Sequence, residues 1–213
     1  TKEVWRQTES FAGYAFAKGH SASYAVESYQ SLFLKAYFPL EYMVATLNNG
    51  GGFYSTELYV HEARMHGASI LPPCVNNSYT QTIIRGINIY LGFGFLHSLE
   101  AKVIKRITSE RVSNGSFLNL DDFMERVSIS IEQIAVLIKI NAFRFTKRNK
   151  RELLWETYMK INKTTFQEKP QTLFKTKKIQ YQTPKLENTK LEDAFDEMEL
   201  LGFPLCNPFE ILR

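Results

Sequence analysis

Cysteine and long apolar runs are both scarce in this sequence. Among 213 residues only Cys74 and Cys206 are cysteines, and no CxxC or Cys/His spacing typical of a zinc site is present. No apolar run reaches the ~18 residues that a membrane span needs. The polar start, Thr1-Lys2-Glu3, resembles neither a signal peptide nor a transit peptide. We therefore expect a protein of the reducing cytoplasm, with no disulfide framework and no membrane partner.

Aspartate is scarce as well, which limits the metal chemistry that the chain can support. The only aspartates are Asp121, Asp122, Asp193 and Asp196. None forms an Asp-x-Asp motif on an apolar, strand-like run, and the first two fall at a predicted helix start, where capping explains them. Three histidines, His61, His66 and His97, show no ligand spacing with carboxylates or cysteines. We predict no metal site and no catalytic residue in this chain.

The remaining composition is that of a globular protein with an uneven charge distribution. With 44% hydrophobic residues, the chain can bury one sizeable core or two small ones. The formal net charge is +4, but the cations cluster: Lys147, Arg148, Lys150 and Arg151, followed by Lys175, Lys177 and Lys178. Beyond Lys190 the charge is mainly acidic. This asymmetry favours a half that faces nucleic acid, although a solvated surface explains the charges equally well.

The first third predicts helices separated by short breaks. A helix over Glu3–Phe16 already includes the start of the chain, so we expect a piece of a longer protein. An amphipathic helix follows a break at Lys18-Gly19, and its apolar positions from Tyr24 to Ala36 predict one packed face. Further helices are expected at 39–48, with Pro39 in its first turn, and at 56–66, closed by Gly67.

The pattern then changes to short strands and returns to helix. Ile70-Leu71-Pro72-Pro73 must be extended, and the runs 79–84 and 87–93 predict a hairpin around Arg85-Gly86. Helices are expected at 98–111, 120–127, 131–140 and 148–162, then an acidic helix at 191–201. The stretch 163–190 is rich in Lys, Thr and Gln and predicts a flexible basic linker. The fold class is therefore mainly α with a small β-hairpin.

Lys18 indicates an anion site at the start of the second helix. The first turn of a helix presents unpaired N–H groups and the positive end of the helix dipole, where a lysine is unfavourable unless an anion lies between them. Lys18 and His20 are thus candidate phosphate ligands, with Tyr14 and Ser21 beside them. The alternative is a structural turn in which Gly19 provides conformational freedom and Ser21 caps the helix.

Several segments resemble the C-family of bacterial replicative DNA polymerases, the family of the DNA polymerase III α subunit. FAGYAFAKGHSASYAVESYQSLFLKAYFPLEYMVATLNN resembles FAGYGFNKSHAAAYAxxSYQTxxLKAxYPxEFMAAxL of the family. GASILPPCVNNS, at 67–78, corresponds to a family segment ending in LPPDVNxS, residues 87–111 correspond to IxxGLxAIKGVGxxxxxxIxxxR, and LLGFPLCNP, at 200–208, resembles the lead into an OB-fold domain. The resemblance leaves only the linker unmatched.

The resemblance implies the end of a polymerase fingers domain at 1–78 and a tandem helix-hairpin-helix domain at 79–162. The basic linker at 163–190 and an acidic helix at 191–213 would lead toward a missing OB-fold domain. The resemblance also implies template-directed transfer of dNTP to a primer by Mg²⁺ ions held outside this chain. We therefore expect the chain alone to polymerise nothing. Other polymerase domains, a sliding clamp and a proofreading subunit would be partners of the parent protein.

Within this resemblance, Lys18, His20, Tyr14 and Ser21 would contact the incoming nucleotide or the primer-template. Basic side chains of the second domain would hold duplex DNA without reading its sequence: Lys102, Lys105, Arg106, Arg111, Lys147, Arg148, Lys150 and Arg151.

Departures from the family pattern leave a second interpretation open. In the first hairpin, residues 96–100 replace Ile-Lys-Gly-Val-Gly, so the glycines that let a phosphate approach the backbone are missing. Asn141 and Lys147 stand at glycine positions of the second hairpin, and Cys74 replaces an aspartate. The alternative is therefore a non-catalytic scaffold or protein-interaction module whose hairpins no longer bind DNA.

Overall fold

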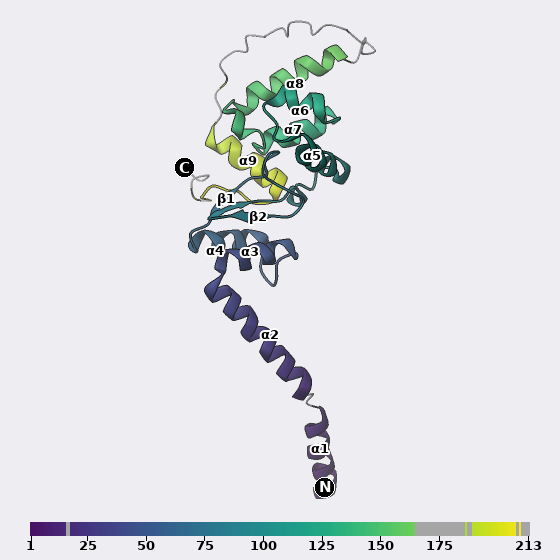
Figure 1. The fold of residues 1–213 in the computed structure, drawn as a ribbon. Helices are drawn as coiled ribbons and strands as arrows, with labels where there is room; N and C mark the ends of the chain where they lie inside the picture. Colours follow the sequence, from purple (N-terminus) through teal and green to yellow (C-terminus); the bar gives the residue numbers. More distant parts are fainter. Residues whose placement is uncertain (16–17, 165–185, 187–188, 208, 210–213) are drawn as a thin grey trace.

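The computed structural model describes residues 1–15, 18–164, 186, 189–207 and 209. Four helices form the N-terminal part: α1 (Lys2–Ala15), α2 (Lys18–Tyr37), α3 (Pro39–Asn48) and α4 (Thr56–Met65). Figure 1 shows α1 and α2 leading away from the rest of the molecule, with the N-terminus at the far end. The helix at 39–48 and the stop at Gly67, with φ of +88°, are confirmed. Of the predicted linker at 163–190, the structure describes only residues 163, 164, 186, 189 and 190, and Pro208 also lies outside the described residues.

The prediction that α2 has a packed face is wrong for this chain. None of its side chains is buried, and Tyr29 and Leu32 are 73% and 65% exposed. Helical periodicity predicts that an apolar face exists, but only tertiary contacts decide whether it is covered. Here α2 touches the body near its C-terminal end, where Ser31 Oγ lies 3.0 Å from Tyr42 Oη and Lys35 pairs with Glu62.

A three-stranded sheet links the N-terminal helices to the rest of the protein. Its strands are β1 (Ser69–Leu71), β2 (Ile83–Arg85) and β3 (Asn88–Tyr90), in the order β1-β3-β2. The predicted hairpin is confirmed as β2 and β3, which are antiparallel and shorter than expected, with Gly86 at a φ of +61° in the turn. β1 pairs in parallel with β3, a long-range contact that no local pattern predicts. In Figure 1, α3 and α4 cover one side of this sheet.

Helices of the C-terminal half pack above the sheet. They are α5 (Ala101–Asn114), α6 (Leu120–Arg126), α7 (Ile131–Lys139), α8 (Lys150–Thr164) and α9 (Lys190–Leu201), with short 3₁₀ turns at Phe93–Phe95 and Arg144–Thr146. Edge-to-face stacking joins Phe117 to Phe123 and Phe123 to Phe143 in the core, with centroids 4.9 and 5.0 Å apart. The expected mainly α class is confirmed. No described helix has the length and hydropathy to span a membrane.

Candidate nucleic-acid interface

The helices α7 and α8 are joined by a turn, residues 140–149, which we call the second hairpin. Two non-glycine residues of this turn have left-handed backbone: Asn141, with φ of 60°, and Lys147, with φ of 56°. These are the two positions where the sequence predicted that glycine had been replaced. Main-chain hydrogen bonds fix the turn, with Asn141 N–H donating to Ile138 O at 2.9 Å and Lys147 N–H to Arg144 O at 3.1 Å. The second hairpin thus keeps a glycine-like backbone without glycine.

Three of the predicted DNA contacts of the second hairpin are exposed. Lys147 lies in the turn, and Arg148 and Arg151 follow at the start of α8. Arg148, in the turn before α8, pairs with Glu156 of α8, and its Nε lies 3.9 Å from Glu152. Arg151 pairs with Glu192 of α9. Since these pairs are partly exposed, they are weak enough for a phosphate to replace the carboxylate.

Lys150 is a correction to the predicted DNA-binding set. Its side chain is only 8% exposed, and its Nζ lies 2.6 Å from both Asp193 and Asp196 of α9 and 3.0 Å from Lys139 O. Burial lowers the pKa of Lys150, but the two carboxylates more than offset this and hold it above its usual value. Lys150 joins α9 to the second hairpin and does not face solvent.

The first hairpin, residues 96–100, turns without left-handed residues. Leu99 N–H donates to Leu96 O at 3.0 Å, and α5 begins at Ala101. The Gln133 side chain from α7 accepts from Glu100 N–H and donates to Ser98 O, both at 2.7 Å. A side-chain amide therefore occupies the N–H group that a phosphate would approach at this helix start. The sequence did not identify Gln133, because its contact is made 33 residues away.

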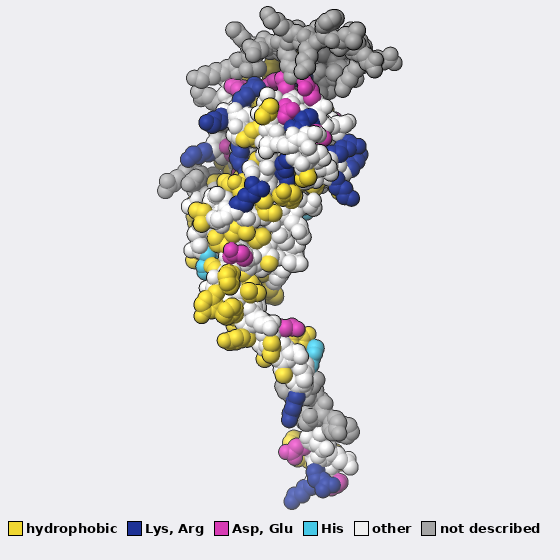
Figure 2. Space-filling view, in the orientation of Figure 1, with side chains coloured by type: hydrophobic (Ala, Val, Ile, Leu, Met, Phe, Trp, Pro, Cys, Tyr) yellow, Lys and Arg dark blue, Asp and Glu magenta, His cyan; other side chains and the backbone are white. Residues whose placement is uncertain are grey.

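Exposed cations gather over α5, as Figure 2 shows. Lys102 pairs with Glu100 at 2.6 Å, and the Arg106 guanidinium donates to Ser128 O at 2.8 Å. Lys105 is exposed and, within the described part of the chain, has no carboxylate partner. These three side chains form a basic strip along the outer face of α5.

Arg111, on the same helix, is a second correction. It is 8% exposed, lies 4.5 Å from the Tyr79 ring and donates to the carbonyls of Val75 and Ser78 at 2.7 and 2.8 Å. Position 111 faces the core because it follows the buried Ile104 and Ile107 at helical spacing. Arg111 holds the 75–78 loop and is unavailable to DNA.

The predicted phosphate ligands of the N-terminal part lie in the first turn of α2. Lys18, His20 and Ser21 are exposed, and the His20 and Tyr24 rings lie edge to face 4.4 Å apart. Ser21 is inside the helix, so its alternative role as the capping residue is wrong, and Gly19 is helical with no positive φ. The Tyr14 side chain lies outside the described set.

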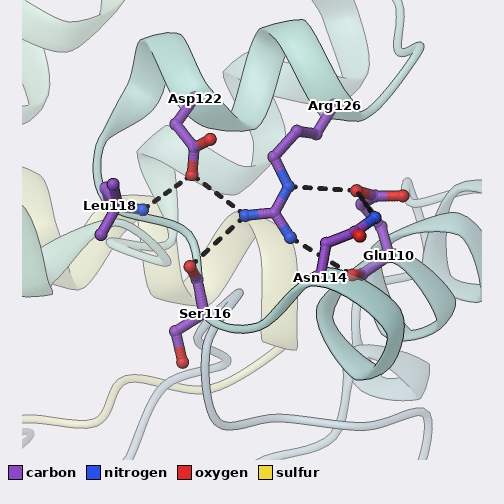
Figure 3. A pocket seen from close by; sticks show the side chains of 6 residues that line it. All are labelled: Glu110, Asn114, Ser116, Leu118, Asp122 and Arg126. Atoms are coloured by element: carbon purple, nitrogen blue, oxygen red, sulfur yellow. Dashed lines mark hydrogen bonds and ion pairs between the residues drawn. The ribbon is translucent and has the colours of Figure 1, made fainter.

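Among the residues that the structure describes, Arg126 is the cation with the most polar contacts, and it was not singled out from the sequence. Its guanidinium lies between Glu110 and Asp122 (Figure 3), 3.1 Å from a carboxylate oxygen of each. It also donates to three carbonyls, Glu110 O, Gly115 O and Ser116 O. The Asn114 amide, and then Arg126, hold the pKa of the Glu110 carboxyl below its usual value. These residues line the pocket of Figure 3, and their polar groups bond one another, so we assign them a structural role in holding α5 against α6.

The aspartates do not form a metal centre among the described residues. Asp122 accepts from Leu118 N–H and pairs with Arg126, Asp121 pairs with Lys160, and the other two pair with Lys150. A two-metal centre needs carboxylates that converge on one point, and these are committed to different cations.

The turn at 140–149 joins α7 to α8, and the turn at 96–100 joins the 3₁₀ turn at Phe93–Phe95 to α5; these turns, with the helices around them, are those of a helix-hairpin-helix domain. The family described as helix-hairpin-helix motif matches residues 67–153.

Relatives extend the match beyond this motif. The error-prone DNA polymerase of Mycobacterium tuberculosis is 32% identical over 155 residues, which cover 71% of this chain and 14% of the relative. The DNA polymerase III subunit alpha of Aquifex aeolicus is 30% identical over 221 residues, covering 100% of this chain and 18% of the relative. The DNA polymerase III subunit alpha of Neisseria meningitidis serogroup A is 34% identical over 167 residues, which cover 75% of this chain and 14% of the relative. The chain belongs to the family of DNA polymerase III α subunits and error-prone DNA polymerases and spans under a fifth of the length of these relatives.

Proposed function

We propose that this chain is a duplex-holding segment of a template-directed DNA polymerase. The observation that carries the proposal is the second hairpin, which keeps left-handed backbone at Asn141 and Lys147 and places exposed cations at the start of α8. A turn of this kind at a helix N-terminus presents N–H groups and positive charge to a phosphate. The polymerase names of the relatives support the same assignment.

Two clusters of basic side chains would contact the same DNA duplex. Lys147, Arg148 and Arg151 would contact phosphates at the second hairpin, and the strip of Lys102, Lys105 and Arg106 would provide charge along α5. With the backbone donor of the first hairpin occupied by Gln133, that half would depend on side chains alone. Contacts of this kind position DNA without reading bases.

In the parent polymerase, Lys18 and His20 at the start of α2 would lie near the phosphates of the dNTP or the primer-template. Nucleotidyl transfer would take place in parts of the enzyme beyond this chain, where Mg²⁺ would neutralise the reacting phosphates. The other polymerase domains, the sliding clamp and the proofreading subunit would be partners of that whole protein. Since the aspartates of this chain hold structural cations, we expect the chain alone to polymerise nothing.

Equilibrium binding to a short primer-template duplex across a salt series, read by anisotropy, tests the duplex-holding role. Each phosphate contact contributes ~0.9 to the slope of log K against log salt. We expect a slope of several units and equal affinity for unrelated sequences. Lys147→Ala with Arg148→Ala should reduce the slope by about 2 and weaken all duplexes alike. A sequence-dependent loss would contradict backbone contact.

A scaffold role is the second candidate, and specific contacts favour it. The Gln133 side chain accepts from the Glu100 N–H of the first hairpin, and carboxylates pair with Arg148 and Arg151 at the second hairpin. Absence of duplex binding at low salt would move the assignment to this candidate.

The nucleotide role needs the complete polymerase. There, Lys18→Ala should lower kcat/KM for dNTP and leave duplex affinity nearly unchanged. Equal losses in both quantities would contradict a role at the nucleotide.

A further inference from the structure

An acidic helix, α9, lies against the second hairpin through ion pairs and apolar contacts. Arg151 pairs with Glu192, Lys150 with Asp193 and Asp196, and Lys139 with Glu199 at 3.0 Å. Ala194, Leu200 and Leu201 of α9 are buried, so the helix is anchored independently of its charges. Its N-terminus is fixed by a capping box in which Thr189 and Glu192 each accept from the other's backbone N–H.

The ion pairs differ in how far DNA can reach them. The Lys150 side chain is 8% exposed, so its two aspartates are part of the interior. The Arg151 and Glu192 side chains are 44% and 41% exposed, at the edge where α9 meets the start of α8. A carboxylate offers a guanidinium the same pair of oxygen acceptors that a phosphate offers. The Glu192 carboxylate and a DNA phosphate therefore compete for the Arg151 guanidinium, which is accessible from solvent.

We infer that Glu192 lowers the affinity of the second hairpin for duplex DNA by holding Arg151 in place of a DNA phosphate. While Glu192 holds Arg151, this cation contributes no phosphate contact, and the buried Lys150 pairs keep α9 in place. The net gain in contacts is smaller than the number of cations at the hairpin suggests. This inference rests on the proposed duplex-holding function and adds to it an acidic residue that sets its strength.

Glu192→Gln in the full chain tests the inference, because glutamine keeps both acceptors of the capping box but removes the charge that holds Arg151. We expect affinity for a mixed-sequence duplex at low salt to rise about threefold, the factor for a partly exposed pair. The slope of log K against log salt should steepen by about 0.9, one additional phosphate contact. Arg151→Ala in the Glu192→Gln background should remove both gains.

Glu3→Gln is the matched control, since it makes the same change in net charge and releases Arg6 from an ion pair on α1, far from the domain. It should leave affinity and slope unchanged. If the wild-type chain binds duplex and Glu192→Gln changes neither quantity, or if Glu3→Gln changes them equally, the inference is overturned while the proposed function stands. If neither the wild-type chain nor Glu192→Gln binds at low salt, the proposed function fails and the inference with it.

Discussion

Single residues show how the environment, rather than the residue type, determines what a charge does in this protein. Lys150 and Arg151 are adjacent in sequence, yet one is buried between two aspartates and the other lies at the edge of α9. Arg106 and Arg111 lie on one helix, and the first is exposed while the second binds carbonyls inside. The family resemblance implied DNA contacts for all four, but Lys150 and Arg111 are buried and the other two are exposed.

Arg126→Ala should lower the free energy of unfolding by about 1–3 kcal/mol, because it removes the guanidinium that bridges Glu110 and Asp122 and donates to three carbonyls. Urea unfolding followed by circular dichroism measures this. Arg106→Ala is the control, since that exposed guanidinium serves one carbonyl. An equal loss in both variants would contradict the structural role of Arg126.

Glu197 makes stability depend on pH in a predictable direction. Burial raises its pKa, and Asp193 adds to this, although the Leu205 N–H that it accepts at 2.6 Å opposes the shift. A carboxyl with a raised folded-state pKa contributes stability in full below the usual Glu pKa, and this stability is lost as pH rises through the folded pKa.

Glu197→Gln keeps an acceptor for Leu205 N–H and cannot ionise. We therefore expect a higher Tm than that of the wild-type protein at pH 7, with the difference closing as the pH falls below the usual Glu pKa. Thermal unfolding over a pH series measures it. A difference that grows at low pH would show that the sign is wrong.

At the scale of elements, local patterns predicted most helices and the turn chemistry. Asn119 caps α6 by accepting from Asp122 N–H at 2.9 Å, and Gly115 ends α5 with φ of +77°. Boundaries were less accurate: α5 starts at Ala101 rather than at 98, because residues 97–99 form the hairpin turn. A local pattern indicates where a helix is stable, but the turn before it depends on contacts with Gln133 from α7.

The left-handed residue Lys147 gives a test of the second hairpin. Lys147→Gly should stabilise the protein by about 0.5–1 kcal/mol, because relief of the strained backbone exceeds the entropy cost of glycine. Lys147→Ala is the control, since it removes the same charge and keeps the strain. Urea unfolding measures the stability of both variants. Equal stability of the two would contradict a left-handed backbone at this position.

On the scale of the whole molecule, the N-terminal helices contribute little to the folded body. Every described side chain before Ser31 is exposed. Removal of residues 1–30 should therefore change the free energy of unfolding by less than about 0.5 kcal/mol and leave duplex affinity unchanged. Thermal unfolding and the salt series measure both. A large loss of stability would show that α1 and α2 pack against the body.

The amino-acid sequence by itself determined the local structure: where most helices begin and end, and the β2-β3 hairpin. These features follow from interactions within a few residues, namely backbone propensity, capping and helical periodicity. Only the tertiary structure decided which cations face solvent and which apolar face is covered. Asp193 and Asp196 reach Lys150 across more than 40 residues of chain, and Gln133 reaches the first hairpin from another helix. Burial is a property of what packs against a residue, and that partner is chosen by long-range contacts which no local pattern contains.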